Sequence, residues 1–253
     1  MADSISPSEA PSPFAGELFF PIYRPATYGR WEVVIGGVGF APGYWSGPSL
    51  VSGMAALLRD GETWMSISPL EIESEEIGIR AGRGHVLILG LGLGWAAAAT
   101  ACLPAVTRVT VVERDPEVIA LHQALDIFSQ LEPEARAKLE IVEADALAYL
   151  PAEPVELMIA DIWQPLVGGD RVTEVRLMQA NVRARSVYFW GQELEIARHA
   201  AAAARPCDDD GVATIAAAFG LPLVGPGTPG YAARVAAAAE RWMRGRWLPA
   251  QER

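Results

Sequence analysis

A glycine-rich turn and an acidic residue at the end of the next apolar run are the residues best suited to chemistry. The strand-like run 85–90 leads into Gly92 and Gly94, and Glu113 ends the second apolar run, 109–113. Glycine lets the backbone approach a ligand closely, and the first N–H groups of a following helix face that ligand. A carboxylate at the tip of the next strand can accept hydrogen bonds from ribose hydroxyls. This pattern predicts a site for an adenosine-containing cofactor, although glycines needed only for turn geometry are the simpler alternative.

Two further carboxylates follow expected strands, at the points where those strands end. Asp145 comes after the run 139–143, and Asp161 comes after 155–160. Ligands of open parallel sheets bind beyond the carboxyl ends of the strands, so both acids should lie near the glycine turn. We expect Asp145 to accept a hydrogen bond from the amino group of adenine, beside the N–H of Ala146. Asp161 should lie nearest the reacting end of the ligand, where the alternative is a helix cap or a solvated acid.

These residues need a sheet that brings strand ends together, and the chain from residue 85 onward alternates between strand and helix patterns. The expected strands cover residues 85–90, 107–113, 139–143, 155–160 and 186–190. Such alternation is typical of parallel strands joined by crossover helices. It predicts an α/β fold with a Rossmann-like, doubly wound, mostly parallel sheet. A short helix is expected between 143 and 155, and only helices are expected beyond residue 191, at 191–204, 211–219 and 229–243.

The first third of the chain has strand patterns and a turn typical of a small sheet. Residues 17–23 and 31–35 are strand-like, and Asp60-Gly61 separates 54–58 from 63–67 as in a tight hairpin. This segment should therefore be a small sheet that precedes the alternating region.

The sequence Ser68-Pro69-Leu70-Glu71 has the form of a capping box, in which Glu71 reaches back to the cap. A helix should follow and run to about Ile79. We therefore expect four parts: a disordered tail (1–13), a small N-terminal β-rich segment (14–68), a cofactor-binding domain (69–192) and a helical C-terminal extension (193–253).

Composition limits the classes of function. A net charge of −11 disfavours a nucleic-acid partner, because a polyanion would be repelled. No apolar stretch reaches the roughly 18 residues of a membrane span, so no membrane association is expected. The three histidines and the two cysteines, Cys102 and Cys207, lack metal-ligand spacing, so no metal is expected. The first 13 residues lack the pattern of a secretion signal, which predicts a cytoplasmic location.

The chain resembles the class I S-adenosylmethionine-dependent methyltransferase superfamily over about residues 55–192, and within it the spermidine-synthase-like proteins. The resemblance rests on Leu58-Arg-Asp60-Gly61, Val86-Leu-Ile-Leu-Gly90, Val109-Thr-Val-Val-Glu113-Arg-Asp115-Pro116, Glu143-Ala-Asp145-Ala146 and Leu157-Met-Ile-Ala-Asp161. It implies S-adenosylmethionine as the cofactor, with Asp161 at the catalytic or orienting carboxylate position. The implied cofactor contacts are Gly90, Gly92, Gly94, Glu113, Arg114, Asp145, Ala146 and Asp161. The β-rich N-terminal segment resembles the N-terminal sheet of that family, which implies a possible homodimer.

Two departures from the aminopropyltransferase pattern bear on the reaction. Leu93 stands where those enzymes have an aspartate in the glycine loop, and Asp161-Ile-Trp-Gln164-Pro165 keeps the first acid of their next motif but loses the second. A diamine needs several acids around it, and residues 64–75 do not obviously restore the lost ones. We therefore predict a methyltransferase for an oxygen or nitrogen nucleophile, with polyamine aminopropyl transfer as the alternative.

Two other functions stay open at this stage. Gly92, Gly94 and Ala97 fit the dinucleotide pattern G-x-G-x-x-A, but no Tyr-x-x-x-Lys pair or obvious proton-relay histidine accompanies them. A partner protein that binds the cofactor without turnover is the third possibility, because the sequence carries no strong acceptor motif.

Aromatic residues directly after the strand ends predict the mouth of the pocket. Tryptophan offers a large rigid face and one donor, so such a mouth favours an aromatic, apolar or peptide acceptor. Ordinary packing beneath the C-terminal helices is the alternative. The candidate substrate contacts are Trp95, Trp163, Gln164, Tyr188, Trp190 and Glu193, with Gln192 also in reach.

Overall fold

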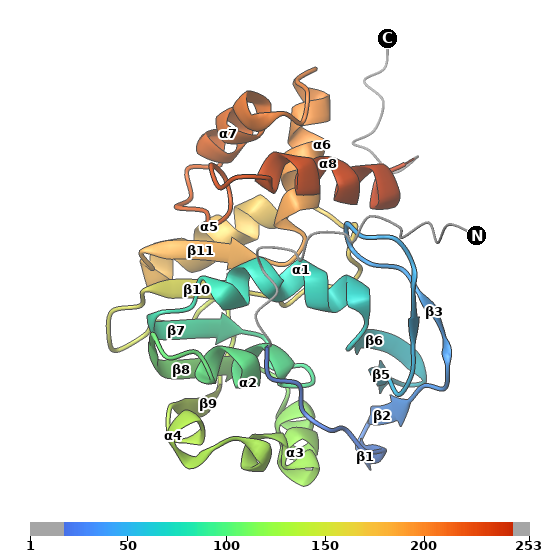
Figure 1. Cartoon of the computed structure of the whole chain (residues 1–253). Coiled ribbons are helices and arrows are strands. Elements are labelled where there is room, and N and C mark those ends of the chain that lie inside the picture. Colours follow the sequence, from blue (N-terminus) through green and yellow to red (C-terminus); the bar gives the residue numbers. More distant parts are fainter. Residues whose placement is uncertain (1–17, 245–253) are drawn as a thin grey trace, which may run out of the picture.

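A computed structural model of the chain describes residues 18–244, and its centre is a five-stranded parallel sheet (Figure 1). The strand order is β11-β10-β7-β8-β9, and every neighbouring pair is parallel. The strands are β7 (Gly84–Leu89), β8 (Val106–Glu113), β9 (Leu139–Glu143), β10 (Leu157–Ala160) and β11 (Ser186–Phe189). The predicted α/β fold with a Rossmann-like parallel sheet is confirmed.

Helices connect these strands and continue beyond them. The helices are α1 (Pro69–Arg80), α2 (Trp95–Ala101), α3 (Pro116–Leu125), α4 (Pro133–Arg136), α5 (Arg171–Val182), α6 (Gln192–Ala202), α7 (Asp209–Ala218) and α8 (Tyr231–Trp242), with a short 3-10 helix at Ile127–Gln130. In Figure 1, α1 and α2 lie in front of the sheet, and the three C-terminal helices gather beyond β11. No helix forms between β9 and β10, so the short helix expected there is wrong.

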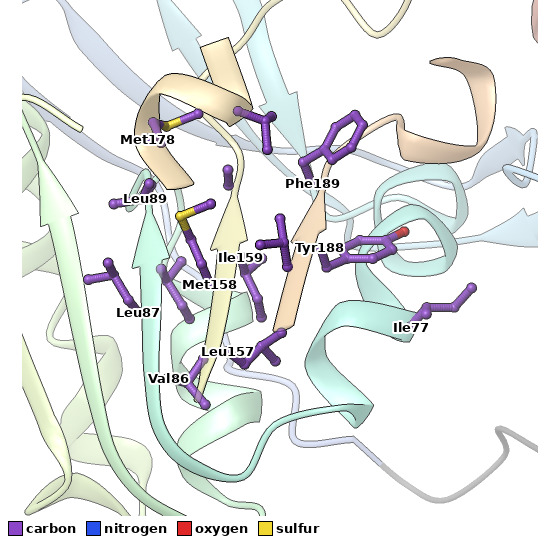
Figure 2. Close-up of a cluster of buried hydrophobic side chains, with 14 of the residues drawn as sticks. Ile77, Val86, Leu87, Leu89, Leu157, Met158, Ile159, Met178, Tyr188 and Phe189 are labelled. Atoms are coloured by element: carbon purple, nitrogen blue, oxygen red, sulfur yellow. The ribbon is translucent and has the colours of Figure 1, made fainter. Parts of the chain in front are cut away.

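The middle of the sheet is closed to solvent on both faces. All four residues of β10 and the run 86–89 of β7 are at most 2% exposed. A strand covered on both faces is apolar at every position, which explains why these runs do not alternate with polar residues. Figure 2 shows the cluster, in which side chains of β7, β10 and β11 pack with Met178 of α5 and Ile77 of α1.

A four-stranded antiparallel sheet precedes the parallel sheet, with strand order β1-β2-β5-β6. Its strands are β1 (Ala26–Tyr28), β2 (Trp31–Ile35), β5 (Ala55–Arg59) and β6 (Glu62–Ser66), and a separate hairpin contains β3 (Gly39–Ala41) and β4 (Ser49–Val51). Asp60 and Gly61 have φ angles of 53° and 82°, as a two-residue hairpin turn requires, so the predicted hairpin is confirmed.

The strand expected at 17–23 is wrong over the residues that the structure describes. Residues 18–23 form no ladder and instead lie against the glycine turn and its neighbours. The Trp95 indole donates to the carbonyl of Phe19, and the Tyr23 hydroxyl donates to the carbonyl of Leu93. These apolar residues are held by side-chain contacts with the parallel-sheet domain rather than by a strand partner. The expected tail at 1–13 lies outside the described residues.

Candidate functional site

One cavity lies beyond the carboxyl ends of β7, β8 and β10, and the N-terminal sheet forms its other wall. Glycine-turn residues, strand-end acids and the faces of β5 and β6 all line it. All eight predicted cofactor contacts line this cavity. Of the predicted residues, the lining includes Gly90, Gly92, Gly94, Trp95, Glu113, Arg114, Asp145, Ala146, Asp161, Trp163 and Trp190.

Gly90 and Gly92, in the turn after β7, stand where the structure leaves no room for a side chain. Gly90 has a φ of 106°, and a Cβ atom added there would lie 2.0 Å from the carbonyl oxygen of Asp161. Gly92 has a φ of 48°, and its added Cβ would lie 2.3 Å from the sulfur of Met65 on β6. Glycine therefore serves two purposes at this turn: it adopts positive φ and it lets β10 and β6 approach. That close approach is the cradle expected of a nucleotide-binding turn.

Glu113 fixes the rim of the cavity next to this turn. One carboxylate oxygen accepts the N–H of Leu91 at 3.0 Å, and the other accepts the N–H of Asp115 at 2.8 Å. Each carboxylate oxygen has a second lone pair, so Glu113 still has acceptor capacity for hydroxyl groups. Asp145 accepts the N–H of Leu147 at 2.9 Å through one oxygen, which leaves its other oxygen for a ligand.

Three carboxyl groups converge at the inner end of the cavity. Asp161 follows β10, and Glu71 and Glu75 lie one turn apart on α1; all three line the cavity. Glu71 and Glu75 are 7% and 4% exposed. Glu75 and Asp161 share a hydrogen bond. We call Glu71, Glu75 and Asp161 the acid cluster.

Burial of these carboxyl groups shifts their protonation. Burial, and then the charge of Asp161, raises the pKa of Glu71 to about 8. Burial also raises the pKa of Glu75 well above its usual range, with further repulsion from Asp161 and Glu71. The pKa of Asp161 rises to about 6 because of burial, opposed by its hydrogen bond with Glu75 and by the positive charge of Arg171. Burial and mutual repulsion therefore favour the protonated forms of Glu71 and Glu75, whereas the hydrogen bond from Glu75 and the charge of Arg171 favour the carboxylate form of Asp161.

Glu71 and Glu75 were not among the predicted site residues. The capping box formed only in part, because the Ser68 hydroxyl accepts the N–H of Glu71 while the Glu71 carboxylate turns toward the N–H of Ser66. The available signal was helical spacing: Glu71 and Glu75 share one face of α1 with Gly78. A Cβ on Gly78 would lie 2.4 Å from the ring of Tyr188, so this face is pressed against the sheet.

Arg171, the first residue of α5, supports the wall beside Asp161. Its guanidinium lies 5.3 Å from the ring centre of Trp163 and 4.9 Å from that of Trp190. It donates to the carbonyls of Trp190 and Pro165, and it is only 3% exposed. The two indoles are therefore held as fixed walls of the cavity by a buried cation.

Three predicted substrate contacts lie outside the cavity lining, which corrects the sequence analysis. The Gln164 amide donates to the carbonyl of Thr63 and joins the loop after β10 to the β5–β6 hairpin. Tyr188 and Glu193 are fully buried in a separate network, where Tyr188 donates to the carbonyl of Ser74 at 2.6 Å. The alternation of side chains along β11 explains why Tyr188 lies outside the cavity. Its side chain points to the face of the sheet that α1 covers.

The network around Glu193 is closed by tyrosine hydroxyls rather than by solvent. Tyr44 and Tyr231 donate to its carboxylate at 3.3 and 3.0 Å, and the Tyr188 hydroxyl, whose proton goes to Ser74, lies 3.3 Å from it; Gln192 donates to the Tyr231 hydroxyl at 2.7 Å. Burial raises the pKa of Glu193 to about 7, against the lowering effect of these hydrogen bonds. Glu193 therefore joins α6 to the β-rich segment, β11 and α8.

The tryptophans that sequence analysis placed at the mouth differ in their surroundings. Trp95 is 2% exposed and stacks on Phe20 with ring centres 5.2 Å apart, so it packs beneath the segment at 18–23. Trp31 and Trp64, which were not among the predicted residues, also line the cavity, and the Trp31 indole donates to the carboxylate of Asp115 at 3.0 Å.

Two searches of the described residues gave negative results. Within residues 18–244, no group of three histidine, cysteine, aspartate or glutamate side chains could hold a metal ion. Over the same residues, no helix is long and apolar enough to span a membrane.

Comparisons with known proteins give weak structural likenesses. No protein-family model matches the chain, and a search of curated proteins finds no match. Among solved structures, the glycopeptide N-methyltransferase MtfA with S-adenosyl-L-methionine is 21% identical over 44% of this chain and 47% of MtfA, with a TM-score of 0.35. A DhpI complex with SAM is 22% identical over 46% of this chain and 50% of DhpI, with a TM-score of 0.33.

A third solved structure, the precorrin-8w decarboxylase of Methanobacterium thermoautotrophicum, is 20% identical over 40% of this chain and 50% of that protein, with a TM-score of 0.30. The chain thus aligns with about half the length of each of these proteins.

Proposed function

We propose that this protein is an S-adenosylmethionine-dependent methyltransferase whose acceptor is a nitrogen nucleophile on a small molecule or peptide. The observation that carries the proposal is that one cavity joins a glycine turn, Glu113 and the acid cluster. The glycine turn and Glu113 suit a ribose and its sulfur-bearing chain. The acid cluster suits an amine, because a buried carboxylate is stabilised by a cation that enters beside it.

Asp161 is the proposed proton acceptor. When bound, S-adenosylmethionine would supply an electrophilic methyl carbon, and its sulfur would leave as a neutral thioether that keeps the electron pair of the broken carbon–sulfur bond. An amine that enters as an ammonium must first lose a proton. Asp161 is the member of the acid cluster whose charged form gains a hydrogen bond from Glu75 and the positive charge of Arg171, so it is the group that takes that proton. Glu75 stabilises the carboxylate of Asp161 by donating the hydrogen bond that they share.

The cavity walls would orient the acceptor. Trp163 and Trp190 are fixed by Arg171, and Trp64 lies on the wall formed by β6. Indole faces attract ammonium groups and apolar chains, so these walls suit an amine carried on an apolar or aromatic body.

Aminopropyl transfer from decarboxylated S-adenosylmethionine to a polyamine is the second candidate. Two acids of the aminopropyltransferase pattern are missing, one from the glycine loop and one from the motif after β10, but Glu71 and Glu75 add two other carboxyl groups to the cavity, which favours a diamine. The two candidates differ in the cofactor: methyl transfer uses the intact molecule, and aminopropyl transfer uses the form that lacks the carboxylate.

Calorimetric titration of the purified protein tests the proposal. We expect S-adenosylmethionine and its demethylated product to bind, and NAD to give no heat. Chromatography of reactions with a panel of amines should then detect S-adenosylhomocysteine rather than methylthioadenosine. Absence of binding by every adenosyl sulfonium would overturn the proposal. Methylthioadenosine as the product would establish the second candidate, and binding without turnover on any amine would indicate a non-catalytic partner protein.

A further inference from the structure

Positive charge is scarce in the cavity. The acidic residues in its lining are Glu71, Glu75, Glu113, Asp115, Asp145 and Asp161. Against them stand two arginines, Arg59 and Arg114. Arg114 directly follows Glu113 at the end of β8, whereas Arg59 ends β5 on the opposite wall. An anionic group of a ligand would therefore be repelled from most of the lining and accepted on the Arg59 wall.

Arg59 is held in place by aromatic rings rather than by an acid. Its guanidinium lies 5.3 Å from the ring centre of Trp31 and 5.7 Å from that of Trp64. The two rings meet edge to face, with centres 5.4 Å apart and planes at 80°. Trp31 is itself anchored to Asp115, so the rings hold the guanidinium in a fixed position.

The guanidinium lacks the partners that usually accompany a partly buried arginine. Its Nε is buried without a hydrogen-bond partner, and no carboxylate of residues 18–244 lies within ion-pair distance of Arg59. The neighbouring Asp60 pairs with Arg30 instead. Arg59 lines the cavity, and its terminal guanidinium N–H groups, which have no protein hydrogen-bond partner within residues 18–244, are the donors that a ligand acceptor would meet.

The wall that carries Arg59 faces the glycine turn. Met65, next to Trp64 on β6, lies close to Gly92. A Cβ atom added to Gly92 would be 2.3 Å from the Met65 sulfur. Arg59 and Trp31 are paired neighbours across β5 and β2, so their side chains share one face of the sheet. The face that holds Arg59 is thus the one that approaches the turn expected to hold the methionine part of the cofactor.

We infer that Arg59 binds the carboxylate of the methionine part of S-adenosylmethionine, and that it selects the intact cofactor over the decarboxylated form. The inference rests on the proposed function. A guanidinium offers a planar fork of donors that matches a carboxylate, and a preorganised fork loses little freedom on binding.

The test compares S-adenosylmethionine with its decarboxylated form on four proteins by calorimetry: the wild type, Arg59→Met, Arg59→Lys and Arg30→Met. The wild type should bind the intact cofactor more tightly. Arg59→Met should weaken binding of the intact cofactor about 10- to 100-fold and change that of the decarboxylated form by less than about 3-fold. Arg59→Lys keeps the charge without the fork and should be intermediate. Arg30→Met removes an exposed arginine of the same sheet and should leave both affinities unchanged.

Each outcome separates this inference from the proposed function. If the wild type binds neither sulfonium, the proposed function fails. If the wild type binds S-adenosylmethionine but Arg59→Met shows the same preference between the two cofactors, the role of Arg59 is wrong while the proposed function stands. If the wild type prefers the decarboxylated form, the inference fails and aminopropyl transfer is supported. Circular dichroism and a shared melting temperature establish that the Met and Lys variants fold, and Arg59→Lys suffices if the Met variant does not.

Discussion

Replacing Glu71 with glutamine should make the protein more stable in alkaline solution. Burial and the charge of Asp161 raise the pKa of Glu71 from 4.5 to about 8 in the folded protein. In the unfolded chain the carboxyl titrates near its ordinary value. The folded state therefore binds this proton more tightly than the unfolded chain does. Its contribution to the free energy of unfolding is fully present below about pH 4.5 and is lost as the pH rises through about 8.

The size of the effect follows from the pKa difference. One pKa unit corresponds to about 1.4 kcal/mol, so a rise of this size costs the wild type up to about 5 kcal/mol once Glu71 is ionised. Glu71 is only 7% exposed, so solvent screening reduces the figure little. Glutamine is neutral at every pH and can still accept the N–H of Ser66. Glu71→Gln should match the wild type near pH 5 and exceed its free energy of unfolding by several kcal/mol near pH 9.5.

Urea denaturation at 25 °C across this pH range measures the difference. Asp161 also titrates within the range and repels Glu71, so the difference between the two curves measures the ionisation of Glu71 together with its interaction with Asp161. Glu134→Gln is the matched control. Glu134 is exposed on α4, and the substitution removes the same ionisable group as Glu71→Gln. Parallel pH dependences for the wild type and Glu71→Gln would refute the reasoning, since they would mean that Glu71 ionises as readily in the folded chain as in the unfolded one.

Three further substitutions test other parts of the site. Asp161→Asn should lower kcat about 100-fold or more while the cofactor Kd changes only a few fold, and turnover preserved within a few fold would remove Asp161 from the chemistry. Gly90→Ala should lower the free energy of unfolding by more than about 2 kcal/mol, because the new Cβ would lie 2.0 Å from a carbonyl oxygen. Gly227 has a φ of 84° and open space around it, so Gly227→Ala should cost only the backbone strain. Equal losses of stability in the two variants would contradict this reasoning. Tyr231→Phe should cost about 1–3 kcal/mol in urea denaturation, because it removes a hydroxyl that donates to Glu193 at 3.0 Å; an unchanged midpoint would show that the buried network is not needed.

The sequence by itself determined the parallel sheet and the sheet edge that lines the cavity. Continuous apolar runs mark strands that are covered on both faces, and β9 begins and ends where the pattern placed it. The glycine turn, Glu113 and Asp161 could be placed because each lies at or directly after the end of a strand, and parallel strands bring their carboxyl ends to one edge. This rule depends only on local pattern and chain direction, so it needs no knowledge of how the helices pack.

Only the tertiary structure decided which charged side chains complete the cavity. Glu71 and Glu75 lie on a helix, and the direction of a helical face depends on what the helix packs against, here β11 through Gly78 and Tyr188. Arg59 reaches the cavity because the N-terminal sheet folds across the glycine turn, which joins residues far apart in the chain. Packing between distant segments sets these positions, because the free energy that fixes them comes from burial of surfaces that the local sequence does not specify.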